Sequence, residues 1–147
     1  MENGINWLPM IVAAFIPLVL GAIYYGPLFG KPWMASLGYT EEDLQGANMP
    51  LIYGVALVLA FLLAMGINFN IELSHKECSD AGDVIYGSFH TFKHGALHGF
   101  FTCLFLAIPV LVTNSLFQRN SWKNILINAG YWFIAFSLMG GLVDAWN

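Results

Sequence analysis

The stretch Ile5–Phe29, INWLPMIVAAFIPLVLGAIYYGPLF, decides the fold because it carries no charged side chain over its whole length. A helix that crosses a membrane needs about 20 mostly apolar residues, and this run meets that length. The run is too long for the apolar core of a secretory signal peptide, and no Lys or Arg precedes it. We therefore interpret it as a membrane span that the protein keeps.

Three further apolar runs of similar length follow along the chain. They extend over about 50–71, 95–117 and 124–146. The pattern predicts an all-α, polytopic integral membrane protein, a four-helix membrane bundle that forms one membrane domain over residues 1–147. Four buried helices of a soluble protein are excluded, because too little of the chain remains to cover them.

The overall composition agrees with a lipid environment. Hydrophobic residues make up 58% of the chain and charged residues 10%, whereas about a quarter of a soluble protein is charged. The formal net charge is -4 and there is no basic patch, so nucleic acid is excluded as a partner. The lipid bilayer is the partner that the composition predicts.

Three polar connections join the expected spans, at 30–49, 72–94 and 118–123. The last is short, so the third and fourth spans should be antiparallel neighbours. Four spans place both termini on one side of the membrane. That side has two basic residues, Lys76 and Lys93, and the other has three, Lys31, Arg119 and Lys123. This small excess favours termini outside the cytoplasm.

Prolines and glycines interrupt the apolar runs. Pro17 and Pro109 lie in mid-span, where each removes a backbone donor and should kink its helix. Two small-residue pairs with GxxxG spacing are candidate packing sites: Gly26 with Gly30, and Gly95 with Gly99. Such pairs permit close helix approach, either between helices of one chain or across the seam of a homo-oligomer.

Polar side chains within the apolar runs are candidates for the protein interior, because polar groups are costly in lipid. Asn114 and Asn128 lie at similar depth if the third and fourth spans form a hairpin, so we expect them to hydrogen bond to each other. Asp144 lies two residues before Trp146, which suggests a place at the membrane interface.

A histidine-rich segment is the strongest candidate for chemistry. His75 and Cys78 have the spacing H-x2-C, and His90 and His94 have H-x3-H, which places the latter pair on one helix face. These four side chains are candidate ligands of a transition metal. The alternative is a solvated face on a short amphipathic helix, extending from about Asp83 into the third span.

The sequence resembles the bacterial membrane proteins of the family called domain of unknown function 1761. One resembling block is GAIYYGPLFGKPWM, over Gly21–Met34, and the other comprises NSLF at 114–117, WKNILINAGY at 122–131, and Met139, Gly140 and Trp146. The resemblance implies a four-helix protein of the bacterial cytoplasmic membrane. It implies no reaction, substrate or catalytic residue.

Two functions fit these observations. The first is a non-enzymatic protein that acts by helix association, as a homo-oligomer or as an accessory subunit of a membrane complex. The alternative is a protein that binds or transports a small molecule or metal ion, using the histidine-rich loop or a cavity lined by Asn114, Asn128 and His98. No catalytic motif is present. We expect no cofactor apart from a transition metal.

Overall fold

The computed structural model describes residues 6–78, 84–86 and 90–146, with the side chains of 6–75 and 90–146. In this part of the chain, four helical segments are long and apolar enough to cross a membrane. They are Trp7–Leu28, Met49–Ser74, Phe92–Phe117 and Trp122–Ala145. The predicted all-α fold with four membrane-length helices is therefore confirmed.

The first span is broken near two of its three prolines. It consists of α1 (Trp7–Ala13), α2 (Ile16–Ile23) and a π-helical turn over Tyr24–Leu28, and α3 (Gly30–Leu37) continues the chain beyond it. Pro17 lies in the first turn of α2 and Pro27 in the π-helical turn. Proline lacks the backbone N–H that a helix interior needs, so the breaks occur where the chain loses that donor.

The third span has the same construction. It consists of α5 (Phe92–Thr102), a π-helical turn over Cys103–Ala107, and α6 (Ile108–Phe117) with Pro109 in its first turn. The wider turn accommodates the proline ring, which would otherwise clash with the preceding turn of a regular helix. The regular α-helix is thus interrupted just before both Pro17 and Pro109, the two positions where a kink was expected.

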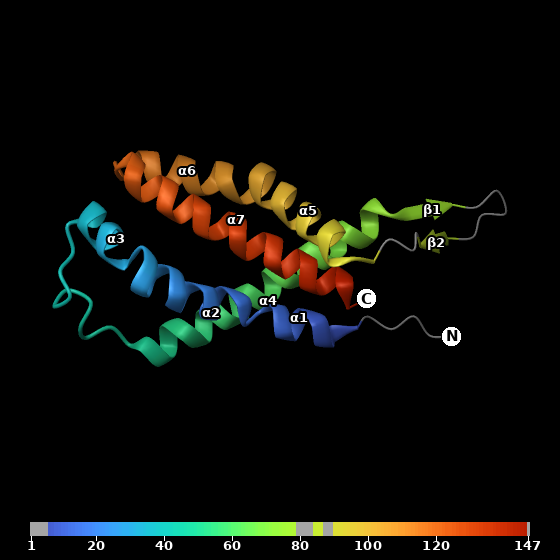
Figure 1. The fold of residues 1–147 in the computed structure, drawn as a ribbon, viewed down its shortest axis with the longest axis horizontal. Coiled ribbons are helices and arrows are strands. Elements are labelled where there is room, and N and C mark those ends of the chain that lie inside the picture. The colour runs from blue at the N-terminus through green and yellow to red at the C-terminus, as the bar shows by residue number, and fades with distance from the viewer. Residues whose placement is uncertain (1–5, 79–83, 87–89, 147) are drawn as a thin grey trace.

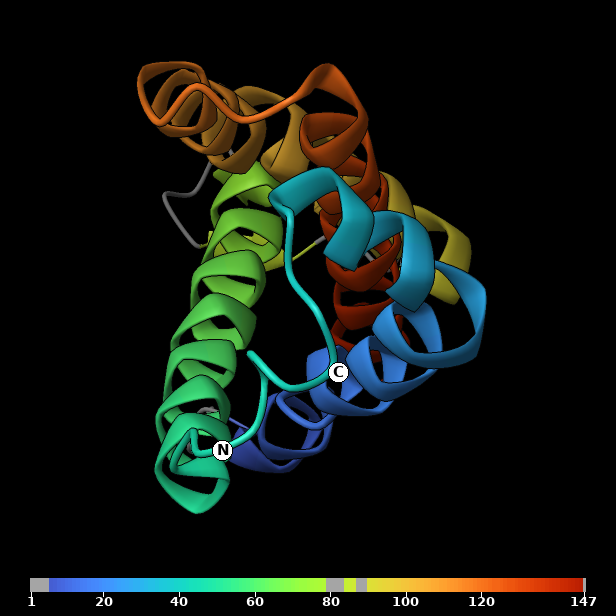
Figure 2. The ribbon, with the colours of Figure 1, turned by 90° about the vertical axis from the view of Figure 1, so that its left-hand side faces the viewer.

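The second and fourth spans are continuous helices, α4 (Met49–Ser74) and α7 (Trp122–Ala145). Side-chain caps begin both: Asn48 accepts a hydrogen bond from the N–H of Leu51, and Ser121 accepts one from the N–H of Asn124. Helix α7 contacts each of the other helices, and Figures 1 and 2 show it between α5–α6 and α1–α2.

One end of the packed helices carries both termini and a short β-ribbon (Figure 1). The ribbon consists of β1 (Lys76–Cys78) and β2 (Val84–Tyr86), which pair antiparallel with Lys76 opposite Tyr86. The prediction of a helix from about Asp83 is therefore wrong over Val84–Tyr86, which form β2. The residues Val84, Ile85 and Tyr86 have high strand propensity, and the Thr91 hydroxyl caps α5 by accepting from the N–H of His94.

Glycines allow α5 and α7 to approach closely. A Cβ at Gly95 would meet the carbonyl oxygen of Gly140 and the side chain of Asp144, and a Cβ at Gly99 would meet the carbonyl oxygen of Phe136. The pair Gly95 and Gly99 therefore packs within the chain. The other expected pair behaves differently, since Gly30 faces the carbonyl of Tyr25 in the preceding π-helical turn and Gly26 faces open space.

Candidate metal site

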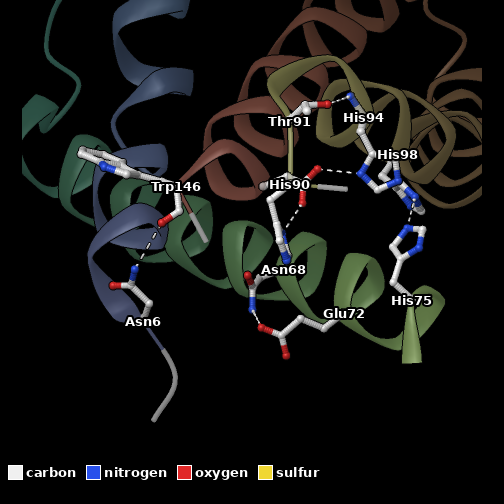
Figure 3. Close-up of polar contacts among 10 residues, drawn as sticks. Asn6, Asn68, Glu72, His75, His90, Thr91, His94, His98 and Trp146 are labelled. Carbon is white, nitrogen blue, oxygen red and sulfur yellow. Dashed lines mark hydrogen bonds and ion pairs between the residues drawn. The ribbon is translucent and has the colours of Figure 1, made fainter. Parts of the chain in front are cut away.

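Three histidines meet at the end of the molecule that carries the termini. His75 directly follows α4, and His94 and His98 lie on α5, one turn apart. Side chains four residues apart share a helix face, so α5 presents two imidazoles in the same direction. Figure 3 shows the rings of His75, His94 and His98 turned toward one another.

The distances within this cluster suit a shared ion. One ligand nitrogen from each ring lies within 4.8 Å of the other two. Nε2 of His75 is 3.0 Å from Nε2 of His98, and the ring centroids are separated by 4.5 to 5.0 Å. Two nitrogens on a tetrahedral zinc ion, at about 2.0–2.1 Å from the metal, are about 3.3 Å apart. The Nε2 atoms of His75 and His98, hydrogen bonded to each other at 3.0 Å, are close to that spacing, and the remaining nitrogen pairs lie within 4.8 Å.

A buried carboxylate orients one of the three rings. Asp144, in the last turn of α7, is 0% exposed, and its Oδ2 lies 2.7 Å from Nδ1 of His94. When Nδ1–H of His94 donates to this oxygen, the lone pair of Nε2 remains available to a metal. Carboxylates behind histidine ligands are the usual arrangement in zinc proteins, where they fix the tautomer and raise the basicity of the ring.

The second oxygen of Asp144 contacts the fourth histidine. Nδ1 of His90 lies 3.2 Å from Oδ1 of Asp144, and the His90 side chain is 43% exposed. A buried carboxylate is costly unless it is paired and hydrogen bonded, and two imidazoles supply those partners here. His90 therefore lies beside the cluster and shares its carboxylate without joining the three rings.

The structure brings together part of the predicted ligand set. Of the candidates, His75 and His94 lie in the cluster, and His90 contacts Asp144. The side chain of Cys78, on β1, lies outside the described part of the chain. The third ring is that of His98, which was not among the predicted ligands.

Asp144 was expected at the membrane interface. The structure places it in the last turn of α7, with its carboxylate buried against α5. The register of the two helices predicts this neighbour. Folding the third and fourth spans about their short connection places residue 144 level with residue 95, one position from His94.

The expected hydrogen bond between Asn114 and Asn128 does not form. Asn128 accepts from the hydroxyl of Tyr25 at 2.7 Å and donates to Oδ1 of Asn124 at 3.0 Å, whereas Asn114 is exposed. Depth alone did not determine the pairing, because Asn114 lies on the outward face of α6. The three residues expected to line a common cavity do not converge: Asn114 is exposed on α6, Asn128 bonds to Tyr25 and Asn124, and His98 lies in the histidine cluster.

Three tyrosines tie the first span to α7 at the other end of the molecule. The hydroxyl of Tyr24 donates to the carbonyl of Ile127, and that of Tyr131 donates to the carbonyl of Pro17 at 2.7 Å. The Tyr25 bond to Asn128 lies between them. These bonds pair side-chain hydroxyls with nearby acceptors, so we assign this cluster to packing. Tyrosines inside apolar runs were the signal for it.

The histidine cluster has the chemistry of an open metal site. Three neutral imidazoles give a divalent ion three ligands and leave a fourth position for water or another molecule, as in zinc sites that exchange ligands. Imidazole is a good ligand for zinc, copper, nickel and iron. The residues present therefore fit a transition metal.

The comparisons with known proteins concern the family alone. No curated protein and no solved structure matches the chain. The profile described as a protein of unknown function (DUF1761) matches residues 8–143, a range that contains all four histidines. The resemblance stated from the sequence blocks is thereby confirmed, and the chain belongs to the DUF1761 family.

Proposed function

We propose that this protein binds a divalent transition metal ion, zinc in the first instance, through His75, His94 and His98. The observation that carries the proposal is the convergence of three imidazoles whose ligand nitrogens lie within 4.8 Å, with a buried carboxylate behind His94. Zinc suits this ligand set because it accepts three histidines and keeps one position open.

The competing interpretation is a solvated histidine face without a metal. Histidines that only meet water need no partner from another helix, yet His75 comes from α4 and the other two rings come from α5. They also need no buried acid, yet Asp144 lies under His94 with a side chain that is 1% exposed. Both features favour the metal site.

The test is the metal content of the purified protein in mild detergent. Wild type, His98→Ala and His90→Ala would be loaded with zinc, dialysed and measured by elemental analysis. We expect one ion per chain in wild type and in His90→Ala, and loss of the ion in His98→Ala. His90→Ala is the histidine comparison: His90 contacts Asp144 but is not one of the three rings, so its loss should leave all three ligands in place.

Cobalt gives a second readout of the same site. Substitution with Co²⁺ should produce the visible absorption of a four-coordinate ion in wild type and in His90→Ala. Equal metal content in all three proteins, or no bound metal in wild type after loading, would overturn the proposal.

The proposal includes a location. The protein would be integral to a bacterial cytoplasmic membrane, with both termini and the histidine cluster outside the cytoplasm. The apolar helices and the excess of basic residues in the connections at the opposite end support this orientation. Reporter fusions to each terminus would test it, and activity of a cytoplasmic reporter at either end would contradict it.

Association into a homo-oligomer, or with a partner subunit of a membrane complex, stays a prediction. Gly95 and Gly99 give it no support, since they pack against α7 of the same chain. Gly26 leaves room for a neighbouring helix. Measurement of the particle mass in mild detergent would test the association, and a strictly monomeric particle would count against it.

A further inference from the structure

A long apolar groove runs along the outside of the packed helices. It has a volume of about 670 Å³ and lies between α4, the third span and α7. Its lining is mainly aliphatic and aromatic and includes Leu62, Gly66 and Leu73 of α4, Leu106 and Val110 of the third span, and Trp132 of α7. Pockets for small organic ligands have volumes in the same range.

The dimensions of the groove match one lipid chain. From Leu62 to Leu73 the helix rises roughly 16 Å, at 1.5 Å per residue. This is about half of the ~30 Å hydrocarbon core of a bilayer, which is the depth of one leaflet. Leu106 and Val110 are more than 60% exposed, so the groove opens sideways to lipid. An acyl chain can therefore enter from the membrane.

The groove approaches the histidine cluster, because its lining includes Leu73, two residues before His75, and Thr102, one turn after His98. Its polar lining residues are Asn70 and Thr102, whose side-chain oxygens lie 3.4 Å apart. The Thr102 hydroxyl donates to the carbonyl of His98 at 2.8 Å. His94, His98 and Thr102 follow one another at four-residue spacing on one face of α5. The same face thus carries two candidate ligands and then the polar end of the groove.

We propose that the groove binds the acyl chain of a long-chain carboxylic acid whose carboxylate completes the coordination of the metal ion. This inference rests on the proposed metal site. Three neutral imidazoles leave the charge of a divalent ion unreduced, and Asp144 offsets only one unit of it. An anionic oxygen is therefore favoured at the open position, and carboxylate oxygens are common zinc ligands.

The first measurement is binding of radiolabelled octadecanoic acid to wild-type protein by scintillation proximity, with and without bound zinc. We expect saturable binding that weakens at least tenfold when zinc is removed. Unlabelled octadecanol has the same chain without the carboxylate, so it should compete poorly with the labelled acid. Equal binding with and without zinc, or equal competition by the alcohol, would overturn the inference and would indicate lipid on an apolar surface only.

A matched pair of glycine variants locates the chain. A Cβ at Gly66 or at Gly54 would meet no atom within 4 Å, and both glycines lie on α4, but only Gly66 lines the groove. Gly66→Leu should fill the groove and weaken acid binding at least tenfold, with zinc content unchanged. Gly54→Leu should bind as wild type does.

The possible results distinguish a failure of this inference from a failure of the proposed metal site. Undiminished acid binding in Gly66→Leu overturns the groove as the place of the chain. Bound zinc in a wild-type protein that takes up no acid overturns this inference and leaves the proposed function intact. Absence of bound zinc overturns both.

Discussion

Asp144 of α7 and His94 of α5 form a 2.7 Å contact although 50 residues separate them and the carboxylate is fully buried. The glycines between the two helices make this contact possible, because a Cβ at Gly95 would overlap the Asp144 side chain. The geometry of the candidate metal site therefore depends on helix packing as much as on the ligands.

Replacement of Asp144 by Asn should weaken zinc binding and leave the three imidazoles in place. Loss of a carboxylate behind a histidine ligand lowers metal affinity by about 10- to 100-fold. The measurement is competition with a chromophoric chelator, using wild type as the comparison. An unchanged affinity in a correctly folded Asp144→Asn protein would contradict the positioning role.

Replacement of Gly95 by Ala should destabilise the protein. The added methyl group would meet the backbone of Gly140, which cannot move away without separating α5 from α7. Overpacking of this kind lowers the free energy of unfolding by about 1–3 kcal/mol. Unfolding in mixed micelles of mild detergent and dodecyl sulfate would measure it.

Gly66→Ala is the control for that experiment, because its Cβ would enter open space and alanine favours the helix. It should be at least as stable as wild type. Equal stability of Gly95→Ala and Gly66→Ala would show that α5 and α7 are not held as closely as described.

Replacement of Tyr25 by Phe should cost about 1 kcal/mol of unfolding free energy, the usual contribution of one hydrogen bond. The hydroxyl donates to Asn128 at 2.7 Å, and its loss leaves the Asn128 oxygen without that donor. Tyr53 is a suitable control, since its side chain is exposed on α4. If Tyr53→Phe were as costly as Tyr25→Phe, the hydrogen bond would not explain the effect.

Asp43, in the connection between α3 and α4, should titrate at unusually low pH. Oδ2 of Asp43 accepts two hydrogen bonds from Thr40, one from its backbone N–H at 2.7 Å and one from its hydroxyl at 2.8 Å. These bonds lower the pKa of Asp43, the backbone bond more than the hydroxyl bond. The pKa of Asp43 is lower in the folded protein than in the unfolded chain. The hydrogen bonds of this turn therefore contribute their full stabilisation at any pH above the ordinary carboxyl pKa. The stabilisation is lost as the pH falls through the folded pKa.

A Thr40→Ala substitution tests this assignment. It removes the hydroxyl bond and keeps the backbone bond, so the pKa of Asp43 should rise part of the way to its ordinary value. Carboxyl chemical shifts followed by NMR would give both titration midpoints. Identical midpoints would mean that the Thr40 hydroxyl does not hold the carboxylate.

The membrane-length helices were predictable because their signal is local. Run length and the scarcity of charge identify each span, and Pro17 and Pro109 mark the breaks without any knowledge of the neighbours. The strand at Val84–Tyr86 was missed because the spacing of His90 and His94 indicates a helix, whereas a strand is indicated only by the propensity of three residues.

The candidate site was only partly predictable because it depends on rotation as well as depth. The H-x3-H spacing identified His94 as a candidate ligand. His98 fits the metal site equally well, because it lies one turn further along the same face of α5. Asp144 is an example in which depth decides the contact, and Asn114 is one in which rotation decides it. The depth of Asp144 follows from the hairpin, while the outward direction of Asn114 follows only from how α6 is turned against α7.

The histidine cluster lies at the ends of α4, α5 and α7. Its two proposed ligands, the metal ion and the fatty acid, would therefore reach it by different routes. An ion would approach from the aqueous phase, without crossing hydrocarbon, at the end where His75 leaves its helix. A fatty acid would approach within the leaflet and enter the groove from the side. Each ligand would then stay in the solvent it prefers until the two meet at the boundary between water and lipid.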